Sequence, residues 1–122
     1  MPLTFLLDEN LPSRMWRAIQ RHNEDNVDIL DLVCVGQPDD LPFSTEDPSI
    51  LLWIERQGRI LITEDKSTMP AHLATHLDHG HHCPGVFMVR SGTRVPELLE
   101  FLVLVAYASQ SMEGHDRIEY IP

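Results

Sequence analysis

The feature that most constrains the fold is an alternation of two kinds of segment. Short apolar runs of strand length alternate with longer segments whose apolar residues fall at helical spacing. The expected strands are 3–7, 27–35, 59–63, 84–89 and 117–121, and the expected helices are 12–22, 48–58, a short one after Pro70, and 95–114. Strands that alternate with helices form a mainly parallel sheet covered on both faces, which also explains the continuously apolar inner strands. The sequence therefore predicts an α/β fold.

Proline and glycine mark the ends of several expected elements. Pro12 lies near the first turn of one helix, Pro48 occupies the first position of the next, and Gly58 comes just past its end. The segment 36–48 is rich in turn-forming residues and long for a connection in an α/β protein, and loops of that length are often functional. The segment 117–121 alternates in polarity, which favours an edge strand.

Length and composition indicate one compact domain, residues 1–122, with a sizeable core, because 43% of the residues are apolar. The N-terminus has no basic region ahead of a long apolar stretch, as a secretory signal would. The longest apolar run, 98–108, is interrupted by Glu100 and is shorter than the roughly 20 residues that span a bilayer. We therefore expect a soluble cytoplasmic protein in which Cys34 and Cys83 are reduced.

The formal net charge of −10 argues against a general nucleic-acid binder. An acidic surface repels a polyanion and lacks the lysines and arginines that supply sequence-independent affinity. Arg14, Arg17 and Arg21 fall at helical spacing and could form a local basic ridge, although a solvated helix face explains them equally simply. Tight, general binding of DNA is therefore disfavoured.

Acidic residues follow two of the expected strands directly. "LLDEN" at 6–10 places Asp8 after the first strand, and "RILITED" at 59–65 places Asp65 after the third. Ligands of open parallel sheets bind beyond the carboxyl ends of the strands, where the winding reverses. If these two strands are neighbours, Asp8 and Asp65 face each other, and Asp47 at the start of a helix can join them. Three gathered carboxylates would raise one another's pKa unless a hard cation such as Mg²⁺ or Mn²⁺ neutralised them.

Each of these acids also has a simpler explanation. Asp47 precedes Pro48 and would be a good helix N-cap. Asp8 or Glu9 would merely end a strand on solvent, as acids after strands commonly do. Only the set favours a metal site: two acids at equivalent strand ends and a third at the start of a helix between them.

The segments "LLDENLPSRMWRAI", "EDPSILLWIERQGRILITEDK" and "PGVFMVR" resemble the short PIN-like proteins, small relatives of the PIN-domain ribonucleases that occur as toxins of toxin–antitoxin pairs. The resemblance implies a PIN-like three-layer α/β/α sandwich with the first strand central. It further implies that Asp8, Asp47 and Asp65 are catalytic ligands of Mg²⁺ or Mn²⁺, with Glu9 as a further contributor, while Ser67 occupies the position of another acidic ligand of the family. The implied activity is hydrolysis of RNA phosphodiester bonds, and the implied partner is a small DNA-binding antitoxin.

Two departures from the family pattern leave an alternative open. Ser67 stands where the family has another acid, and a hydroxyl can contact metal-bound water but cannot supply the missing charge. The loop 36–46 is longer than in the family and could cover or reshape the site. The alternative is a catalytically inactive PIN-like binding or assembly module. In the active alternative, Lys66 and Asn10 would contact substrate, and the apolar helix from Val95 could contribute to a homodimer.

A histidine-rich segment, "HLATHLDHGHHC" at 72–83, is a second candidate metal site. The ligand types suit Zn²⁺ or Ni²⁺, and two of the histidines are four residues apart on an expected helix. The candidate ligands are His72, His76, His79, His81, His82 and Cys83. Their spacing matches no standard zinc pattern, so a polar linker with adventitious metal affinity is the competing explanation.

Overall fold

The structure, a computed structural model, describes residues 3–108 and 115–121. Strands and helices alternate along the chain, as the sequence predicted. In order they are β1 (Thr4–Leu7), α1 (Ser13–Asp25), β2 (Asp31–Cys34), α2 (Asp47–Gln57), β3 (Ile60–Thr63), α3 (Met69–Asp78), β4 (Val86–Val89), α4 (Val95–Ala108) and β5 (Ile118–Ile121). Among the described helices, none is long and apolar enough to cross a membrane.

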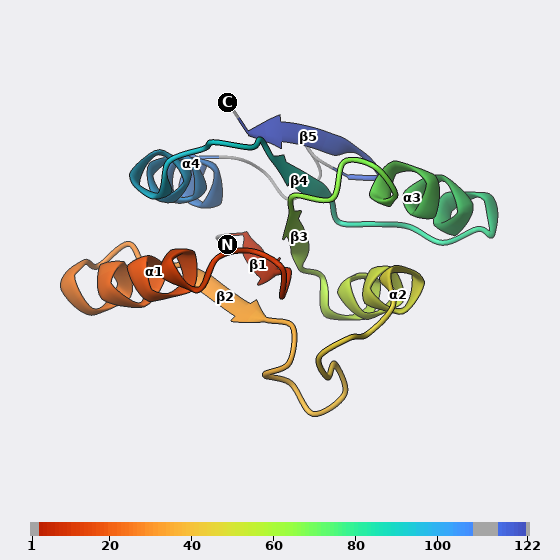
Figure 1. The fold of residues 1–122 in the computed structure, drawn as a ribbon, viewed down its shortest axis with the longest axis horizontal. Coiled ribbons are helices and arrows are strands. Elements are labelled where there is room, and N and C mark those ends of the chain that lie inside the picture. The colour runs from red at the N-terminus through yellow and green to blue at the C-terminus, as the bar shows by residue number, and fades with distance from the viewer. Residues whose placement is uncertain (1–2, 109–114, 122) are drawn as a thin grey trace.

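The five strands form one parallel sheet in the order β2-β1-β3-β4-β5. The chain winds outward from β1 to β2, returns to β3 on the other side of β1, and then continues through β4 to β5. The winding therefore reverses between β1 and β3. Helices α1 and α4 cover one face and α2 and α3 the other (Figure 1). The predicted α/β class, with a sheet between two helical layers, is confirmed.

Some details of the prediction differ from the structure. The resemblance implied a central first strand, yet β1 lies between β2 and β3, and β3 holds the middle position. The predicted edge position of β5 is confirmed. The second strand was expected over 27–35 but covers only Asp31–Cys34. The Asn23 side chain explains the later start, because it accepts from the Leu30 N–H at 2.8 Å and donates to the Leu30 carbonyl at 2.9 Å.

One helix boundary also differs, and another expected boundary lies outside the described residues. Helix α1 was expected to end at residue 22 and continues to Asp25. Helix α4 was expected over 95–114 and covers Val95–Ala108, while 109–114, including Gly114, lie outside the described residues. Gly58 follows α2 in the left-handed conformation at φ 71°, so its predicted role just past the helix end is confirmed.

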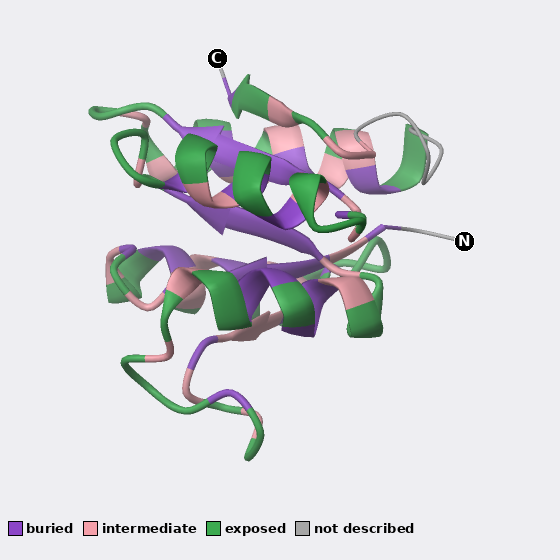
Figure 2. Ribbon diagram, turned by 90° about the vertical axis from the view of Figure 1, so that its right-hand side faces the viewer, coloured by how far each residue is buried: buried purple, intermediate pink, exposed green. Residues whose placement is uncertain are grey.

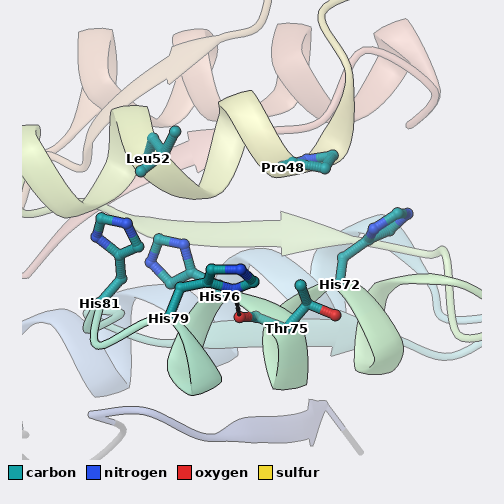
Figure 3. A pocket seen from close by; sticks show the side chains of 7 residues that line it. All are labelled: Pro48, Leu52, His72, Thr75, His76, His79 and His81. Carbon is teal, nitrogen blue, oxygen red and sulfur yellow. Dashed lines mark hydrogen bonds between the residues drawn. The ribbon is translucent and has the colours of Figure 1, made fainter.

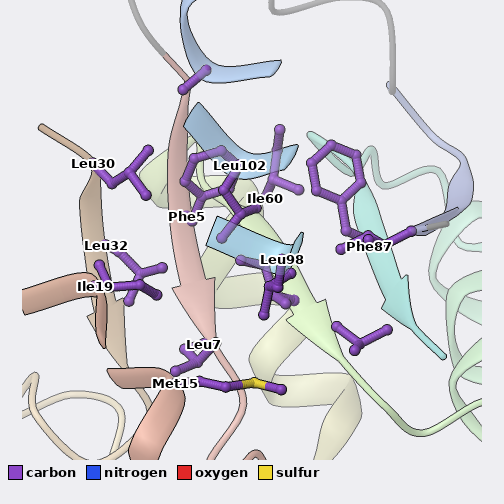
Figure 4. Close-up of a cluster of buried hydrophobic side chains, with 14 of the residues drawn as sticks. Phe5, Leu7, Met15, Ile19, Leu30, Leu32, Ile60, Phe87, Leu98 and Leu102 are labelled. Carbon is purple, nitrogen blue, oxygen red and sulfur yellow. The ribbon is translucent and has the colours of Figure 1, made fainter. Parts of the chain in front are cut away.

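The core consists of two layers, one on each face of the sheet. Along β1, Phe5 and Leu7 contribute to the cluster under α1 and α4, while Leu6 contributes to the cluster under α2 and α3. Every residue of β3 and β4 is buried (Figure 2), and Figure 4 shows the first cluster around Phe5 and Phe87. Burying one such aliphatic or aromatic side chain contributes about 1.5–3 kcal/mol. These strands therefore hold their carboxyl ends in fixed positions.

Candidate functional site

The acidic residues lie at the carboxyl ends of β1 and β3, on either side of the point where the winding reverses. The two strands are paired in parallel, with Leu7 opposite Ile62. The Asp8 N–H continues this pairing by donating to the Ile62 carbonyl at 3.0 Å. Asp8 and Asp65 are therefore held at the position where open parallel sheets bind their ligands. The expectation that the first and third strands are neighbours is confirmed.

Thr63 connects Asp8 to Asp65. Asp8 is buried, and its Oδ2 accepts a hydrogen bond from the Thr63 hydroxyl at 2.8 Å. The same hydroxyl oxygen accepts from the Asp65 backbone N–H at 3.2 Å. A fully buried threonine at the end of β3 thus orients one carboxylate and positions the backbone of the other.

The Asp65 carboxylate is surrounded by local donors. Its Oδ1 accepts from the Ser67 N–H at 3.2 Å, the Ser67 hydroxyl at 3.0 Å and the Thr68 N–H at 3.1 Å. Its Oδ2 accepts from the Thr68 hydroxyl. The Thr68 hydroxyl, followed by the other donors, holds the pKa of Asp65 below its usual value. Asp65 is thus ionised and also anchors the turn that leads into α3.

Asp47 experiences the opposite electrostatic environment. Burial is the largest cause of its raised pKa; the charge of His72 lowers the pKa, and the charges of Asp65 and Asp8 raise it further. The His72 Nε2 lies 3.7 Å from the Asp47 Oδ2. Helix α2 begins at Asp47 itself, with Glu46 in the N-cap position and no side-chain cap hydrogen bond. N-capping therefore does not explain Asp47.

The three acids are within electrostatic range of one another but do not converge on one point. Among the described residues, two groups have three potential ligand atoms all within 4.8 Å of one another, and neither includes this trio. The two groups are Glu55, His76 and His81, and His82, His115 and Asp116.

Glu9 and Asn10 follow Asp8 in an exposed turn, closed by a hydrogen bond from the Leu11 N–H to the Asp8 carbonyl at 3.2 Å. The Glu9 Oε1 accepts from the Ser44 N–H at 2.7 Å. Glu9 therefore ties the loop 36–46 to the end of β1. Asn10 is exposed, and its predicted substrate contact stays a prediction.

Lys66 is exposed and lines a pocket of about 430 Å³ beyond the ends of β3 and β4. Arg90, Ser91 and Tyr120 also line this pocket, and the Arg90 guanidinium lies 5.3 Å from the centre of the Tyr120 ring. Sequence reasoning missed Arg90 and Tyr120. The only signal was their position at or next to the ends of strands.

The histidine-rich segment divides between different partners. His76 and His81 both approach Glu55 of α2, while His82 joins His115 and Asp116 just before β5. Glu55, His115 and Asp116 were missed because they are distant in sequence and no local pattern distinguishes them. The predicted placement of His72 and His76 on one helix is confirmed by α3.

The remaining members of the segment have other contacts. His72 faces Asp47, and the His79 Nδ1 lies 2.7 Å from the Thr75 carbonyl one turn earlier. Cys83 is fully buried in the core, and burial raises the pKa of its thiol to about 11. A protonated, enclosed thiol is a poor metal ligand because metals bind the thiolate. Cys83 therefore belongs to the core of the α2–α3 face.

Comparisons of this chain with family models, with curated proteins and with solved structures give no significant match.

Proposed function

We propose that the protein is a divalent-metal-dependent ribonuclease whose site is formed by Asp8, Asp47 and Asp65. The observation that carries the proposal is the placement of three carboxylates within electrostatic range of one another at the reversal of the sheet winding. The mutual charge of these acids contributes to the raised pKa of Asp47. Charge repulsion of this kind is relieved by a bound cation.

The donor set fits Mg²⁺ or Mn²⁺, because all three side chains offer hard carboxylate oxygens. When bound there, such an ion activates a water for attack on phosphorus and offsets charge on the leaving oxygen. Thr63 orients Asp8 for this role, and the donors around Asp65 keep that residue ionised. Because the trio does not converge within 4.8 Å, a side-chain adjustment would accompany binding.

The neighbouring pocket supports RNA as the substrate. Lys66 and Arg90 supply positive charge beside the acidic edge, and Tyr120 offers an aromatic ring on which a base can stack. Neither the charge contacts nor the stacking depends on base identity, and stacking on Tyr120 requires an unpaired base. The proposed substrate is therefore single-stranded RNA.

The acidity of the whole chain fits a weakly binding or partner-gated enzyme. We further propose that a small DNA-binding antitoxin neutralises the nuclease activity in the cytoplasm. The nuclease would bind this antitoxin either as a monomer or as a homodimer. The exposed face of α4, with Leu104 and Tyr107, is one surface available for such contacts.

The test is cleavage of a fluorescently labelled single-stranded RNA by tag-free protein in Mn²⁺, in Mg²⁺ and in chelator. Asp8→Asn and Asp47→Asn test the site, and His115→Ala, which alters a distant polar cluster, is the matched control. We expect metal-dependent cleavage by the wild type and by the control, with a loss of at least about a hundredfold in both acid variants. Equal cleavage by the wild type and Asp8→Asn would refute the ribonuclease assignment.

A specific observation favours a second candidate, the inactive binding module. Both oxygens of Asp65 already accept hydrogen bonds from Ser67 and Thr68, so this acid performs a structural task. Retention of the same RNA in a gel-shift experiment, without cleavage in either metal, would select this candidate.

A further inference from the structure

Glu55, His76 and His81 form a compact cluster between α2 and α3. Glu55 comes from α2, His76 from α3 and His81 from the loop that follows α3. The His76 Nε2 and the His81 Nδ1 each lie 3.2 Å from the Glu55 Oε1. Figure 3 shows the His76 and His81 rings beneath α2, and their centroids are 4.8 Å apart in a stacked arrangement.

The two nitrogen–oxygen distances to the Glu55 Oε1 are close to the spacing of neighbouring ligand atoms around a tetrahedral metal. In tetrahedral coordination at about 2.1 Å, neighbouring ligand atoms lie about 3.4 Å from each other. All three side chains place a ligand atom within 4.8 Å of the other two. The acidic trio at the sheet edge does not meet this criterion. The Glu55 cluster therefore differs from the acidic trio in that its ligand atoms already lie close together.

The surroundings hold the cluster in this geometry. The His76 side chain is only 4% exposed, which fixes its ring against α2. The other Glu55 oxygen, Oε2, accepts from the His82 N–H at 3.1 Å, which leaves Oε1 directed at the two rings. The His76 Nε2 also lies 2.9 Å from the His82 carbonyl, so this nitrogen carries a proton that a metal would displace.

We propose that Glu55, His76 and His81 bind Zn²⁺ with an open fourth position. Two imidazoles and one carboxylate suit zinc, and three protein ligands with one vacant position are typical of reactive rather than purely structural zinc. The two histidines line a pocket of about 250 Å³ together with Leu52, His72, Thr75 and His79, and this pocket would admit a water or a small anionic ligand. The zinc proposal does not rest on the ribonuclease proposal, although His72 both lines this pocket and contacts Asp47.

The nearest competitor is the cluster of His82, His115 and Asp116. The His82 Nδ1 and the His115 Nε2 lie 3.1 and 3.3 Å from the same Asp116 oxygen. The His82 side chain is 67% exposed, whereas His76 is buried, so more side-chain freedom would be lost on binding there. The buried, preoriented ring of His76 therefore favours the Glu55 cluster.

The experiment is calorimetric titration of the tag-free, metal-free full chain with Zn²⁺ at pH 7.5. Glu55→Gln and His81→Ala remove two partly exposed ligands, so that a folding defect in one leaves the other as a test. His82→Ala is the matched control, because it removes the competing ring and retains the backbone N–H that contacts Glu55. Far-UV circular dichroism verifies that each metal-free variant is folded.

We expect one Zn²⁺ per chain, a loss of affinity of at least about tenfold in Glu55→Gln and His81→Ala, and a change below about twofold in His82→Ala. Affinity should also fall at pH 5.5, because protons compete for the imidazoles. The proposal is overturned if wild-type protein takes up no Zn²⁺, if folded Glu55→Gln and His81→Ala bind like wild type, or if His82→Ala abolishes binding.

Discussion

The acidic edge of the sheet and the histidine cluster between α2 and α3 are opposite kinds of candidate metal site. The acidic trio lies where the fold predicts a ligand, at the reversal of the winding, but its oxygens do not converge. The Glu55–His76–His81 cluster converges closely but lies in the helical layer formed by α2 and α3. Position in a fold and convergence of donor atoms are therefore separate indications of a metal site.

The two places also differ in their electrostatics. At the sheet edge, acids of like charge oppose one another, and the pKa of Asp47 is raised in part for that reason. At the histidine cluster, one carboxylate faces two imidazoles that can hold a proton in place of a metal. A cation bound at the acidic edge would relieve this repulsion, whereas the histidine cluster satisfies its polar atoms without one.

The largest expected effect is a selective loss of metal-induced stabilisation, in which each variant loses the response to one metal and keeps the response to the other. Mn²⁺ at about a hundred times its dissociation constant should stabilise the wild type by roughly 2.7 kcal/mol, as Zn²⁺ should at its own site. Asp8→Asn should abolish the Mn²⁺ shift and retain the Zn²⁺ shift, and His81→Ala should do the reverse. Thermal melts of metal-free protein with each ion measure this. Loss of both shifts in a single variant would show that the two places are not independent.

A smaller effect is expected at Thr63. Thr63→Val leaves the buried Asp8 carboxylate without its donor, which should cost about 1–3 kcal/mol of unfolding free energy. Thr63→Ser keeps the hydroxyl and should lose markedly less. Urea unfolding of both variants measures the difference. If valine were as stable as serine, the hydroxyl would not be orienting Asp8.

Asp65→Ala should destabilise the protein by about 1 kcal/mol at pH 7, because the start of α3 loses its acceptor. The lowered pKa of Asp65 means that its contribution is present above the unfolded-state pKa of about 4. That contribution is lost as the pH falls through the lower folded-state pKa. The difference between variant and wild type should therefore shrink in acid, and urea unfolding at a series of pH values tests it. A constant difference down to pH 2 would contradict this account.

The smallest effect, and the one with opposite sign, is expected at Asp47. In metal-free protein, Asp47→Asn should raise stability at pH 7 by less than about 1 kcal/mol, because it removes a carboxylate disfavoured by burial and by like charges. A raised pKa means that the folded protein binds the proton more readily, so the wild type regains this stability as the pH falls through that pKa. The advantage of the variant should then disappear. A destabilised variant at pH 7 would instead show that the contact of Asp47 with His72 dominates.

Patterns local in sequence predicted most of the fold. Apolar runs of strand length located β1, β3 and β4, and Gly58 located the end of α2. The prediction of strand bounds failed where a side chain outside the strand itself bonds the backbone. The Asn23 side chain delays β2 by bonding the Leu30 backbone, and a window over 27–35 contains no signal of that contact.

The residues of the candidate sites were predictable only where local sequence patterns determine their position. Asp8 and Asp65 were identifiable because every parallel strand delivers its carboxyl end to the same edge. Glu55 was not, because its relation to His76 and His81 depends on how α2 and α3 pack. The likeness to PIN-like proteins stays a prediction, since no comparison bears on it.

The α/β class, the strand ends that carry Asp8 and Asp65, and the net negative charge follow from the periodicity and composition of the sequence. The middle position of β3, the hydrogen bond from Thr63 to Asp8, and the contact of Glu55 with two histidines are visible only in the tertiary structure. Such contacts join residues far apart in the chain. They depend on side-chain packing in three dimensions, which local sequence patterns do not specify.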